Sequence, residues 1–337
     1  MAYPIKRRNF IKSASLLGAS MAIGNPGPDK IFLQVNEEAV IKNDFFSVLF
    51  NREKGTIDIY RRGGAPLVTG GTVCVNTTAG KRCLSSGKFR HRLNTAGFSD
   101  QLGRGTRLFI YSKDAEGVSD LETQVSLYDQ LEAVTVETIC RNVAGHDLVL
   151  NSLEPLRVVT GEGAAFSVPA VSKCITNGEM YFDTGVVHAF GTNADAVSSG
   201  ELKGVKLSNH SVAARNETIH SWWNAGLFSG YDREGMVLGY LENTLCLGNL
   251  LISRTAADQI SFLAESVYAP ELLLKPGKTC RSNRLMINIA ANPYLALETY
   301  AAAVGKANNA RTHSVLNGWC RWFYKLAQVS ENEVVAN

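Results

Sequence analysis

Two adjacent tryptophans carry the side chains of this sequence that are best suited to bind a ligand. In HSWWNAG, residues 220–226, Trp222 and Trp223 precede Asn224. Aromatic faces beside an amide can stack on a sugar ring and hydrogen-bond its hydroxyl groups, whereas paired tryptophans in a β protein more often pack in a core. We therefore favour packing for Trp222 and Trp223 and keep both as candidate substrate-binding residues.

Other catalytic or ligand-binding patterns are missing from the sequence. GLFSG, residues 226–230, has the wrong spacing for a serine nucleophile elbow, and TGEGAAF, residues 160–166, lacks the third glycine of a dinucleotide loop. The six histidines show no paired ligand spacing. We therefore expect no metal site and no cofactor.

The elements that must position these residues are strands. From residue 31 to about 290, apolar and polar residues alternate with a period of two, as in half-buried antiparallel strands. FFSVLF (45–50) and TIDIY (56–60) are joined through NREKG, which predicts a hairpin that ends at a glycine. The absence of amphipathic helices from this span predicts a large sandwich of two antiparallel sheets.

The pattern changes after this region. ANPYLALETYAAAVGK, residues 291–306, predicts a helix capped by Asn292, with Pro293 in its first position and an end at Gly305. Leu297, Tyr300, Ala301 and Val304 recur in it at helical spacing. VLNGWCRWFY (315–324) then predicts a buried strand, and SENE (330–333) is a capping box that opens another helix. A strand followed by a helix is the beginning of a βα unit.

The final segment, GWCRWFYKLAQVSENEVVAN, resembles the start of the catalytic barrel of glycoside hydrolase family 36, which holds bacterial α-galactosidases and plant raffinose and stachyose synthases. The residues that match are Gly318, Trp319, Cys320, Trp322, Ser330, Glu331 and Glu333. The sequence departs from the family pattern at Arg321 and Phe323. LLLKPGKTCRSNRLMINIAANPYLALETYAAAVG and FFSVLFNREKGTIDIYRRGGAPLVTGG are similar to the family's last sandwich strands, its helix and its opening hairpin.

This resemblance implies a β-supersandwich of the galactose-mutarotase type, followed by a (β/α)8 barrel. The expected segments are the supersandwich (29–291), a helix and linker (292–316), and the start of a truncated barrel (317–337), after an export signal (1–28) that is inferred separately from the first residues. The resemblance also implies retaining hydrolysis of α-galactosides by two barrel aspartates. No position matches those aspartates, so we expect them beyond Asn337 and expect the chain alone to be inactive. Trp319 is the implied aromatic wall of the sugar site, with barrel packing as its alternative. The resemblance also suggests a homo-oligomer for the complete enzyme.

The first residues resemble a twin-arginine export signal. Arg7 and Arg8 precede Phe10, and a short apolar run, too short to span a bilayer, leads to NPGPDK. Cleavage after Ala22 would remove four of the 34 Lys and Arg and none of the 31 Asp and Glu, which changes the formal charge from +3 to −1. We therefore expect an exported, periplasmic protein without a membrane span and without a nucleic-acid partner.

The seven cysteines are widely spaced, and no two form a Cys-x-x-Cys pair. This spacing argues against a zinc ribbon and against a dense disulfide framework. Cys74 and Cys140 lie in strand-like patterns and are interpreted as small buried hydrophobic residues. The spacing still allows one or two disulfides if the protein lies in an oxidising compartment.

Three hypotheses for function follow from the sequence. The first is the N-terminal portion of an exported, α-galactosidase-like glycoside hydrolase. The alternative is a freestanding carbohydrate-binding or structural β-sandwich. The third and weakest is a mutarotase- or lyase-like enzyme that uses the sandwich itself, because the sequence shows no convergent histidine and carboxylate motif. A reading frame that continues past Asn337 would separate the first hypothesis from the second.

Overall fold

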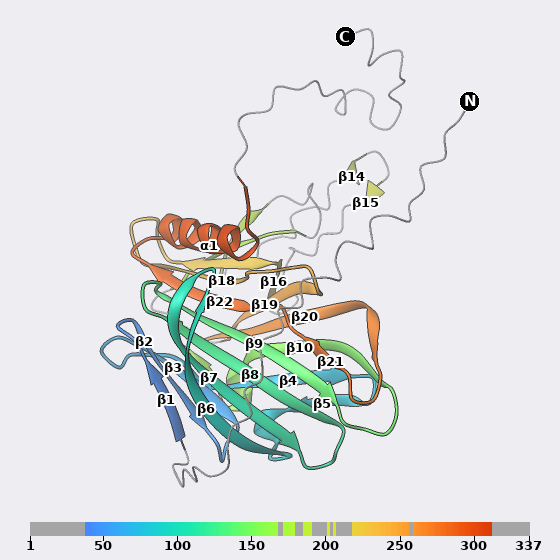
Figure 1. Cartoon of the computed structure of the whole chain (residues 1–337). Coiled ribbons are helices and arrows are strands. Elements are labelled where there is room, and N and C mark those ends of the chain that lie inside the picture. Colours follow the sequence, from blue (N-terminus) through green and yellow to red (C-terminus); the bar gives the residue numbers. More distant parts are fainter. Residues whose placement is uncertain are drawn as a thin grey trace, which may run out of the picture. The chain divides into compact units, whose positions relative to one another are not determined.

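The structure is a computed structural model that describes residues 38–167, 171–178, 185–190, 201–202, 205–206, 218–255 and 259–311. The predicted export signal, the predicted barrel start and Trp319 lie outside the described residues. Within the described part, the strands form two ten-stranded antiparallel sheets, here called sheets A and B, and a two-stranded ribbon, and one α-helix follows the last strand (Figure 1). The predicted sandwich of antiparallel sheets is confirmed.

Sheet A contains, in order of pairing, β1 (Glu38–Lys42), β2 (Phe46–Asn51), β3 (Thr56–Arg61), β4 (Pro66–Thr77), β10 (Leu148–Val158), β20 (Gln259–Leu274), β19 (Leu247–Thr255) and β16 (Thr218–Trp222), with β5 (Gly80–Cys83) and β11 (Ala165–Phe166) beside this path. Sheet B contains β13 (Val186–Ala189), β12 (Lys173–Thr176), β17 (Asn224–Phe228), β18 (Gly235–Tyr240), β22 (Leu285–Ala290), β9 (Ala133–Asn142), β8 (Ser119–Tyr128), β7 (Gly103–Asp114) and β6 (Phe89–Asp100), with β21 (Thr279–Arg281) paired to β9. The ribbon is β14 (Glu201–Leu202) with β15 (Val205–Lys206), and two 3-10 turns are η1 (Leu84–Ser86) and η2 (Thr160–Glu162).

The predicted hairpin joins β2 to β3. Asn51 pairs with Thr56, and the Asn51 side chain accepts a hydrogen bond of 2.9 Å from the backbone N–H of Lys54. Gly55 has a φ of 64°, and a Cβ there would lie 2.2 Å from the carbonyl oxygen of Leu84. Only glycine satisfies both the left-handed backbone and this close approach, so the glycine at the end of the predicted turn is required.

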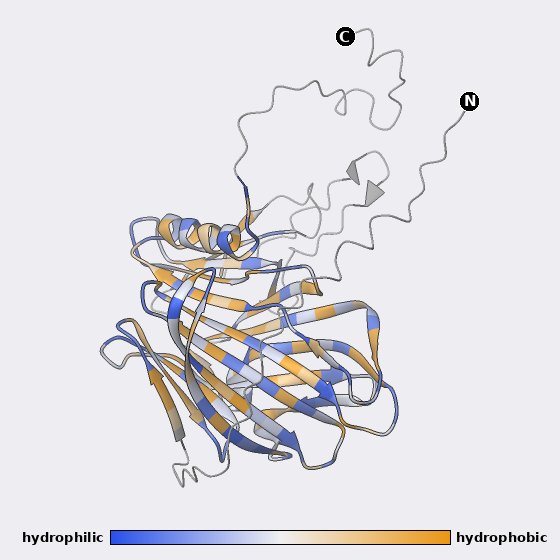
Figure 2. Cartoon of the chain, viewed as in Figure 1, coloured by the Kyte–Doolittle hydropathy of each residue, from blue (hydrophilic) through white to orange (hydrophobic). Residues whose placement is uncertain are grey.

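The core of the sandwich lies between the inner faces of the two sheets. Alternate residues of strands such as β2, β3 and β7 are buried, and Figure 2 shows orange and blue bands along the arrows. Completely buried residues come from both sheets: Val48, Phe50, Ile57 and Ile59 from sheet A, and Leu108, Ile110, Val125 and Leu127 from sheet B. Burial of each such side chain stabilises the fold by roughly 1.5–3 kcal/mol, so this shared core holds the two sheets together.

The helix α1 (Pro293–Ala307) lies along β18 and β22 of sheet B (Figure 1). Its predicted start is confirmed, because the Asn292 side chain accepts a hydrogen bond of 2.9 Å from the N–H of Leu295. The buried face is Pro293, Ala296, Tyr300 and Ala303, so Ala301, predicted to share the periodic face, is instead exposed. The helix also continues two residues past Gly305, since Asn308 caps its end through the carbonyls of Val304 and Leu241.

One disulfide is present among the described residues, and it joins Cys74 of β4 to Cys83 of β5. Cys74 is completely buried, as the sequence predicted, but it is bonded rather than a free apolar side chain. The thiols of Cys140, Cys174 and Cys246 are free and buried, and that of Cys280 is free and half-buried.

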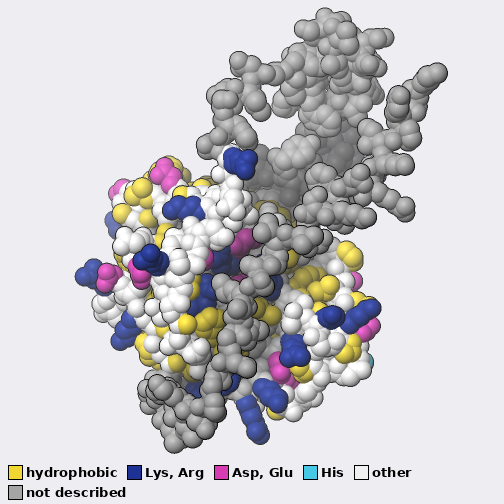
Figure 3. Space-filling view, in the orientation of Figure 1, with side chains coloured by type: hydrophobic (Ala, Val, Ile, Leu, Met, Phe, Trp, Pro, Cys, Tyr) yellow, Lys and Arg dark blue, Asp and Glu magenta, His cyan; other side chains and the backbone are white. Residues whose placement is uncertain are grey.

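The charged surface of the described part is mixed. Figure 3 shows Lys and Arg side chains scattered among Asp and Glu over the face that it presents. Among the described residues, no helix is both long enough and apolar enough to cross a membrane.

Candidate functional site

Trp223 is the corner at which the chain leaves sheet A and enters sheet B. It lies between Trp222, the last residue of β16, and Asn224, the first residue of β17. Its N–H donates a hydrogen bond of 2.9 Å to the carbonyl of Gly248 in β19, and its carbonyl accepts one of 2.8 Å from the N–H of Tyr240 in β18. Its φ is 67°, a left-handed value that bulky residues rarely adopt. Such strained positions cluster at functional sites, so this corner is a candidate.

A cavity of about 320 Å³ opens beside this corner, between the sheet switch and the C-terminal half of α1. We call it the Trp223 pocket. Its aromatic lining is Trp223, Tyr240 and Tyr300, and its polar lining is Asn224, Glu242, Asn243 and Asn308, with Leu241, Ala301 and Val304 completing the wall. Aromatic side chains with a few convergent polar groups are the usual lining of a small-molecule pocket.

The polar groups of the Trp223 pocket are held in fixed positions. The Tyr300 hydroxyl donates a hydrogen bond of 2.7 Å to the carbonyl of Tyr240, and burial raises the pKa of Tyr300, so the hydroxyl stays protonated. Glu242 accepts a hydrogen bond of 2.6 Å from Arg284. Asn224 accepts one of 2.8 Å from the side-chain amide of Asn177. Such a rigid lining can bind hydroxyl groups without first being ordered, which lowers the cost of binding.

The two candidate tryptophans have different environments. Trp223 is half-buried and lines the pocket, as does Asn224. Trp222 is only 8% exposed and is not among the residues that line the pocket. Its ring lies 5.2 Å from that of His220 and 6.3 Å from that of Trp223, between centroids. The structure thus brings Trp223 and Asn224 to a cavity and gives Trp222 a packing environment.

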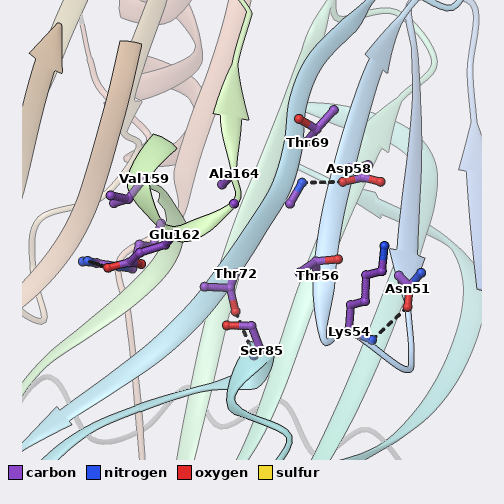
Figure 4. A pocket seen from close by; sticks show the side chains of 13 residues that line it. Asn51, Lys54, Thr56, Asp58, Thr69, Thr72, Ser85, Val159, Glu162 and Ala164 are labelled. Atoms are coloured by element: carbon purple, nitrogen blue, oxygen red, sulfur yellow. Dashed lines mark hydrogen bonds and ion pairs between the residues drawn. The ribbon is translucent and has the colours of Figure 1, made fainter. Parts of the chain in front are cut away.

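A second cavity, of about 370 Å³, lies over β3 and β4 beside η2 (Figure 4). The Asp58 carboxylate accepts the N–H of Gly70 at 2.6 Å, and Arg157 holds both carboxylate oxygens of Glu162 at 2.6 and 2.8 Å. No aromatic residue lines it. Sequence reasoning missed this cavity because its lining comes from separate strands and turns, and it offers a sugar no stacking surface.

A third cluster is a row of polar side chains on the outer face of sheet A, which we call the Glu154–His220 row. It consists of Lys81, Asn76, Ser152, Glu154, Glu265, Asn249 and His220, from the neighbouring strands β5, β4, β10, β20, β19 and β16. Residues next to them in sequence, such as Val75, Ala264 and Leu250, point into the core. The row therefore lies on the opposite face, because successive side chains of a strand alternate.

Direct contacts join the members of this row. Lys81 Nζ lies 2.6 Å from the completely buried carboxylate of Glu154. Asn249 donates a hydrogen bond of 3.1 Å to Glu265, and its side-chain oxygen contacts the ring of His220. Burial and the charge of Glu154 raise the pKa of Glu265. A histidine and two carboxylates therefore belong to one hydrogen-bonded row, in which Asn249 lies between His220 and Glu265, although no sequence motif marks it. None of these side chains lines either cavity described above.

The scan against protein-family models finds no match, and neither does the search of curated proteins. Solved structures with the same fold do exist. The α-galactosidase from Lactobacillus brevis aligns over 90% of this chain with a TM-score of 0.53 and 12% identity. A family 36 α-galactosidase variant from Geobacillus stearothermophilus, in complex with raffinose, aligns over 79% with a TM-score of 0.50 and 10% identity. The galactosidase domain of an α-galactosidase–sucrose kinase aligns over 78% with a TM-score of 0.50 and 9% identity.

These alignments define the class of fold: a large two-sheet β-sandwich followed by a helix, shared with family 36 α-galactosidases. At such low identity the likeness concerns the fold alone. The chain spans less than half of the length of these structures, 46% of the Lactobacillus brevis chain and 42% of the Geobacillus chain.

Proposed function

We propose that this chain is the N-terminal portion of an exported, retaining α-galactosidase-like glycoside hydrolase that acts on α-galactosides, and that the chain alone is inactive. The observation that carries the proposal is the fold shared with α-galactosidases over 90% of the chain. The resemblance of the segment from Gly318 to Glu333 to the first strand and helix start of the family's barrel supports the same assignment.

The carboxylates of the described cavities support inactivity of the sandwich. Retaining hydrolysis needs two carboxyl groups about 5–5.5 Å apart, one of them protonated so that it can act as an acid. The Trp223 pocket is lined by Glu242, which is paired with Arg284. In the other cavity, the hydrogen bonds from Arg157 hold the pKa of Glu162 below its ordinary value. The second carboxylate of that cavity, Asp58, accepts the backbone N–H of Gly70. Both of its carboxylates are thus bound by donors of the sandwich itself, and we assign the chemistry to barrel aspartates beyond Asn337.

Export is part of the proposal and rests on two observations. The order of Arg7, Arg8 and Phe10 resembles a twin-arginine signal. The disulfide between Cys74 and Cys83 is of the kind that persists in oxidising compartments such as the periplasm. Replacement of Arg7 and Arg8 by lysine is expected to leave the protein in the cytoplasm, as measured by cell fractionation. Unchanged delivery to the periplasm would contradict this part of the proposal. We also propose a homo-oligomer for the complete enzyme, which size-exclusion chromatography with light scattering would test.

Hydrolysis is the direct test of the enzymatic part. The purified 337-residue chain is expected to release no nitrophenol from a nitrophenyl α-galactoside. Turnover by this chain would overturn the assignment of catalysis to the barrel.

A second candidate function, a freestanding carbohydrate-binding module, is favoured by the Trp223 pocket. Its aromatic wall and amide groups suit a pyranose ring, which stacks one face and hydrogen-bonds at its edges. In this case the sandwich binds galactose or raffinose without hydrolysing either sugar.

Calorimetric titration with galactose and raffinose tests this second candidate. Trp223→Ala is expected to weaken binding about tenfold or more, because the stacking face is lost. Asn243→Ala, at an exposed pocket residue, tests the same site with little risk to folding. Tyr231→Ala is the matched control, since Tyr231 is an exposed aromatic residue that does not line the pocket. Equal affinities in all four proteins would exclude the pocket as a sugar site.

A further inference from the structure

Two cysteines lie directly opposite each other in sheet B. Cys280 of β21 pairs with Cys140 of β9. Two residues to either side, the N–H of Asn142 donates to the carbonyl of Lys278 at 3.0 Å, and the N–H of Ser282 donates to the carbonyl of Thr138 at 2.8 Å. Hydrogen-bonded pairs recur at every second residue of an antiparallel ladder, so Cys140 and Cys280 occupy such a pair, with Cα atoms about 5.5 Å apart. This separation lies within the range that a disulfide spans.

The two thiols interact, and the contact makes them unequal. The hydrogen bond between the sulfur atoms lowers the pKa of Cys280, and the same bond together with burial raises the pKa of Cys140. Thiolates are the attacking species in disulfide exchange, so the thiol that solvent and oxidant reach more easily is expected to react first.

Cys280 is more accessible to solvent than Cys140. Cys140 is completely buried in the middle of sheet B, whereas Cys280 is half-buried. Cys280 lies on a strand of three residues whose only paired neighbour among the described strands is β9. Such short edge elements open locally at low free-energy cost, so a small oxidant can reach Cys280 before it reaches Cys140.

The protein already contains one disulfide between residues that face each other across neighbouring antiparallel strands. Cys74 and Cys83 are direct partners across β4 and β5, as Cys140 and Cys280 are across β9 and β21, and their sulfurs are bonded. Among the other described thiols, Cys246 lies close enough to Cys280 that, besides burial, the charge of Cys280 raises the pKa of Cys246. Cys246 does not face Cys280 across a pair of strands, because β21 pairs with β9. Cys246 is therefore the competing partner that an experiment must exclude.

We propose that Cys140 and Cys280 are a modification site, a reactive dithiol that a small disulfide such as oxidised glutathione converts into a second cross-strand disulfide. The Cys280 thiolate attacks one sulfur of the oxidant, which releases one glutathione thiolate and leaves a mixed disulfide on Cys280. Cys140 then loses its proton to solvent and attacks the Cys280 sulfur, which releases the second glutathione. Two protein thiols are oxidised to one disulfide, and one oxidised glutathione is reduced to two thiols.

The proposed disulfide lies in the segment that connects the two sheets. Residues 275–284 connect β20 of sheet A to β22 of sheet B, and β21 lies in this connection. Tyr268 of β20 already donates a hydrogen bond of 2.8 Å to the carbonyl of Arg281. A bond from Cys280 to Cys140 attaches the same connection covalently to β9, so oxidation is expected to protect residues 275–284 from hydrogen exchange and from proteolysis.

The test is differential alkylation with peptide mapping of the folded 337-residue chain. Protein kept in reduced glutathione is compared with protein kept in an excess of oxidised glutathione, and cysteine-containing peptides are identified by mass spectrometry. The expected result is a cross-linked peptide pair containing Cys140 and Cys280, lighter by about 2 Da than the two reduced peptides together. Labelling of Cys174 and Cys246 is expected to stay unchanged.

Three variants assign the roles. In Cys140→Ser, Cys280 is expected to accumulate as a mixed disulfide with glutathione, because the resolving thiol is absent. In Cys280→Ser, Cys140 is expected to stay a free thiol, and in Cys246→Ser the cross-link is expected to form as in the unaltered chain. The proposal is overturned if both thiols of the unaltered chain stay reduced, if Cys280 pairs with Cys246, or if its glutathione adduct persists without a cross-link. Because the unaltered chain gives the main result, a variant that fails to fold leaves the proposal testable.

Discussion

Trp223 donates its backbone N–H to the carbonyl of Gly248 over 2.9 Å, and this bond fixes the point at which the chain passes from one sheet to the other. The carbonyl of Trp223 accepts from Tyr240 on the opposite side, so both backbone groups of the corner are satisfied. These two bonds hold a bulky residue at a φ of 67° and place its side chain in the pocket wall. The pocket thus depends on a backbone conformation that the tryptophan does not itself favour.

This relationship predicts an inverted order of stability at residue 223. In ordinary strands glycine is less stable than alanine by roughly 0.5–1 kcal/mol, whereas at a left-handed φ the Cβ of alanine costs about 1 kcal/mol or more. We therefore expect Trp223→Gly to be at least as stable as Trp223→Ala in urea unfolding. At Val187, an exposed residue of β13, the control pair V187G and V187A should show the usual order. A Trp223→Ala protein clearly more stable than Trp223→Gly would contradict the left-handed corner.

The hydrogen bond from Tyr300 to the carbonyl of Tyr240 predicts how α1 is attached. Tyr300→Phe removes the donor and leaves a buried carbonyl without it, which is expected to destabilise the fold by about 1–2 kcal/mol. Hydrogen exchange in α1 is expected to become faster. The control is Tyr294→Phe on the exposed side of the helix, where a change within about 0.5 kcal/mol is expected. Equal unfolding midpoints for the two variants would show that the bond contributes nothing.

Asp114 gives a prediction about pH. Burial raises the pKa of this carboxyl, but hydrogen bonds from the backbone N–H groups of Glu116, Ser119 and Val118, and from Arg82, outweigh burial and hold the pKa below its ordinary value of 3.8. A carboxyl with a lowered pKa stabilises the fold fully above its unfolded-state pKa. That stabilisation is lost as the pH falls through the lower folded-state pKa.

Asp114→Asn is therefore expected to be less stable than the unaltered chain by about 2 kcal/mol at neutral pH. Below about pH 4 the difference is expected to shrink, because the unaltered chain then loses the stabilisation that the variant never had. Urea unfolding at a series of pH values measures this difference. Asp44→Asn, at an exposed aspartate, is the control and should follow the unaltered chain. A difference that stays constant down to the lowest pH would be inconsistent with a lowered pKa of Asp114.

The elements that the sequence predicted well are those with local signals. The β2–β3 hairpin follows from alternating residues and a turn that ends at Gly55, and α1 follows from Asn292 and Pro293. The end of α1 was predicted two residues early. The helix ends at the capping residue Asn308, whose side chain donates to the carbonyl of Leu241, a residue that is distant in sequence. The disulfide between Cys74 and Cys83 was not predicted, because Cys74 was interpreted as a small buried hydrophobic residue, although the two residues lie on neighbouring strands joined by a short turn.

Only part of the candidate site could be predicted from the sequence. HSWWNAG identified Trp223 and Asn224 by residue type, but no local signal marks the change of sheet between Trp222 and Asn224. That change depends on bonds to strands that follow later in the chain, and so do the pocket walls at Glu242 and Tyr300. The Glu154–His220 row was missed for the same reason, because its members come from strands far apart in the sequence and adjacent only in the sheet.

The measurement that tests the central proposal most directly compares two proteins from one gene on a nitrophenyl α-galactoside. One is the 337-residue chain, and the other is translated from the reading frame continued past Asn337. The account predicts no turnover by the first and hydrolysis by the second, with proton NMR showing that the first-formed galactose keeps the α configuration. Turnover by the 337-residue chain, a reading frame that stops at Asn337, or a longer protein that leaves α-galactosides intact would contradict it.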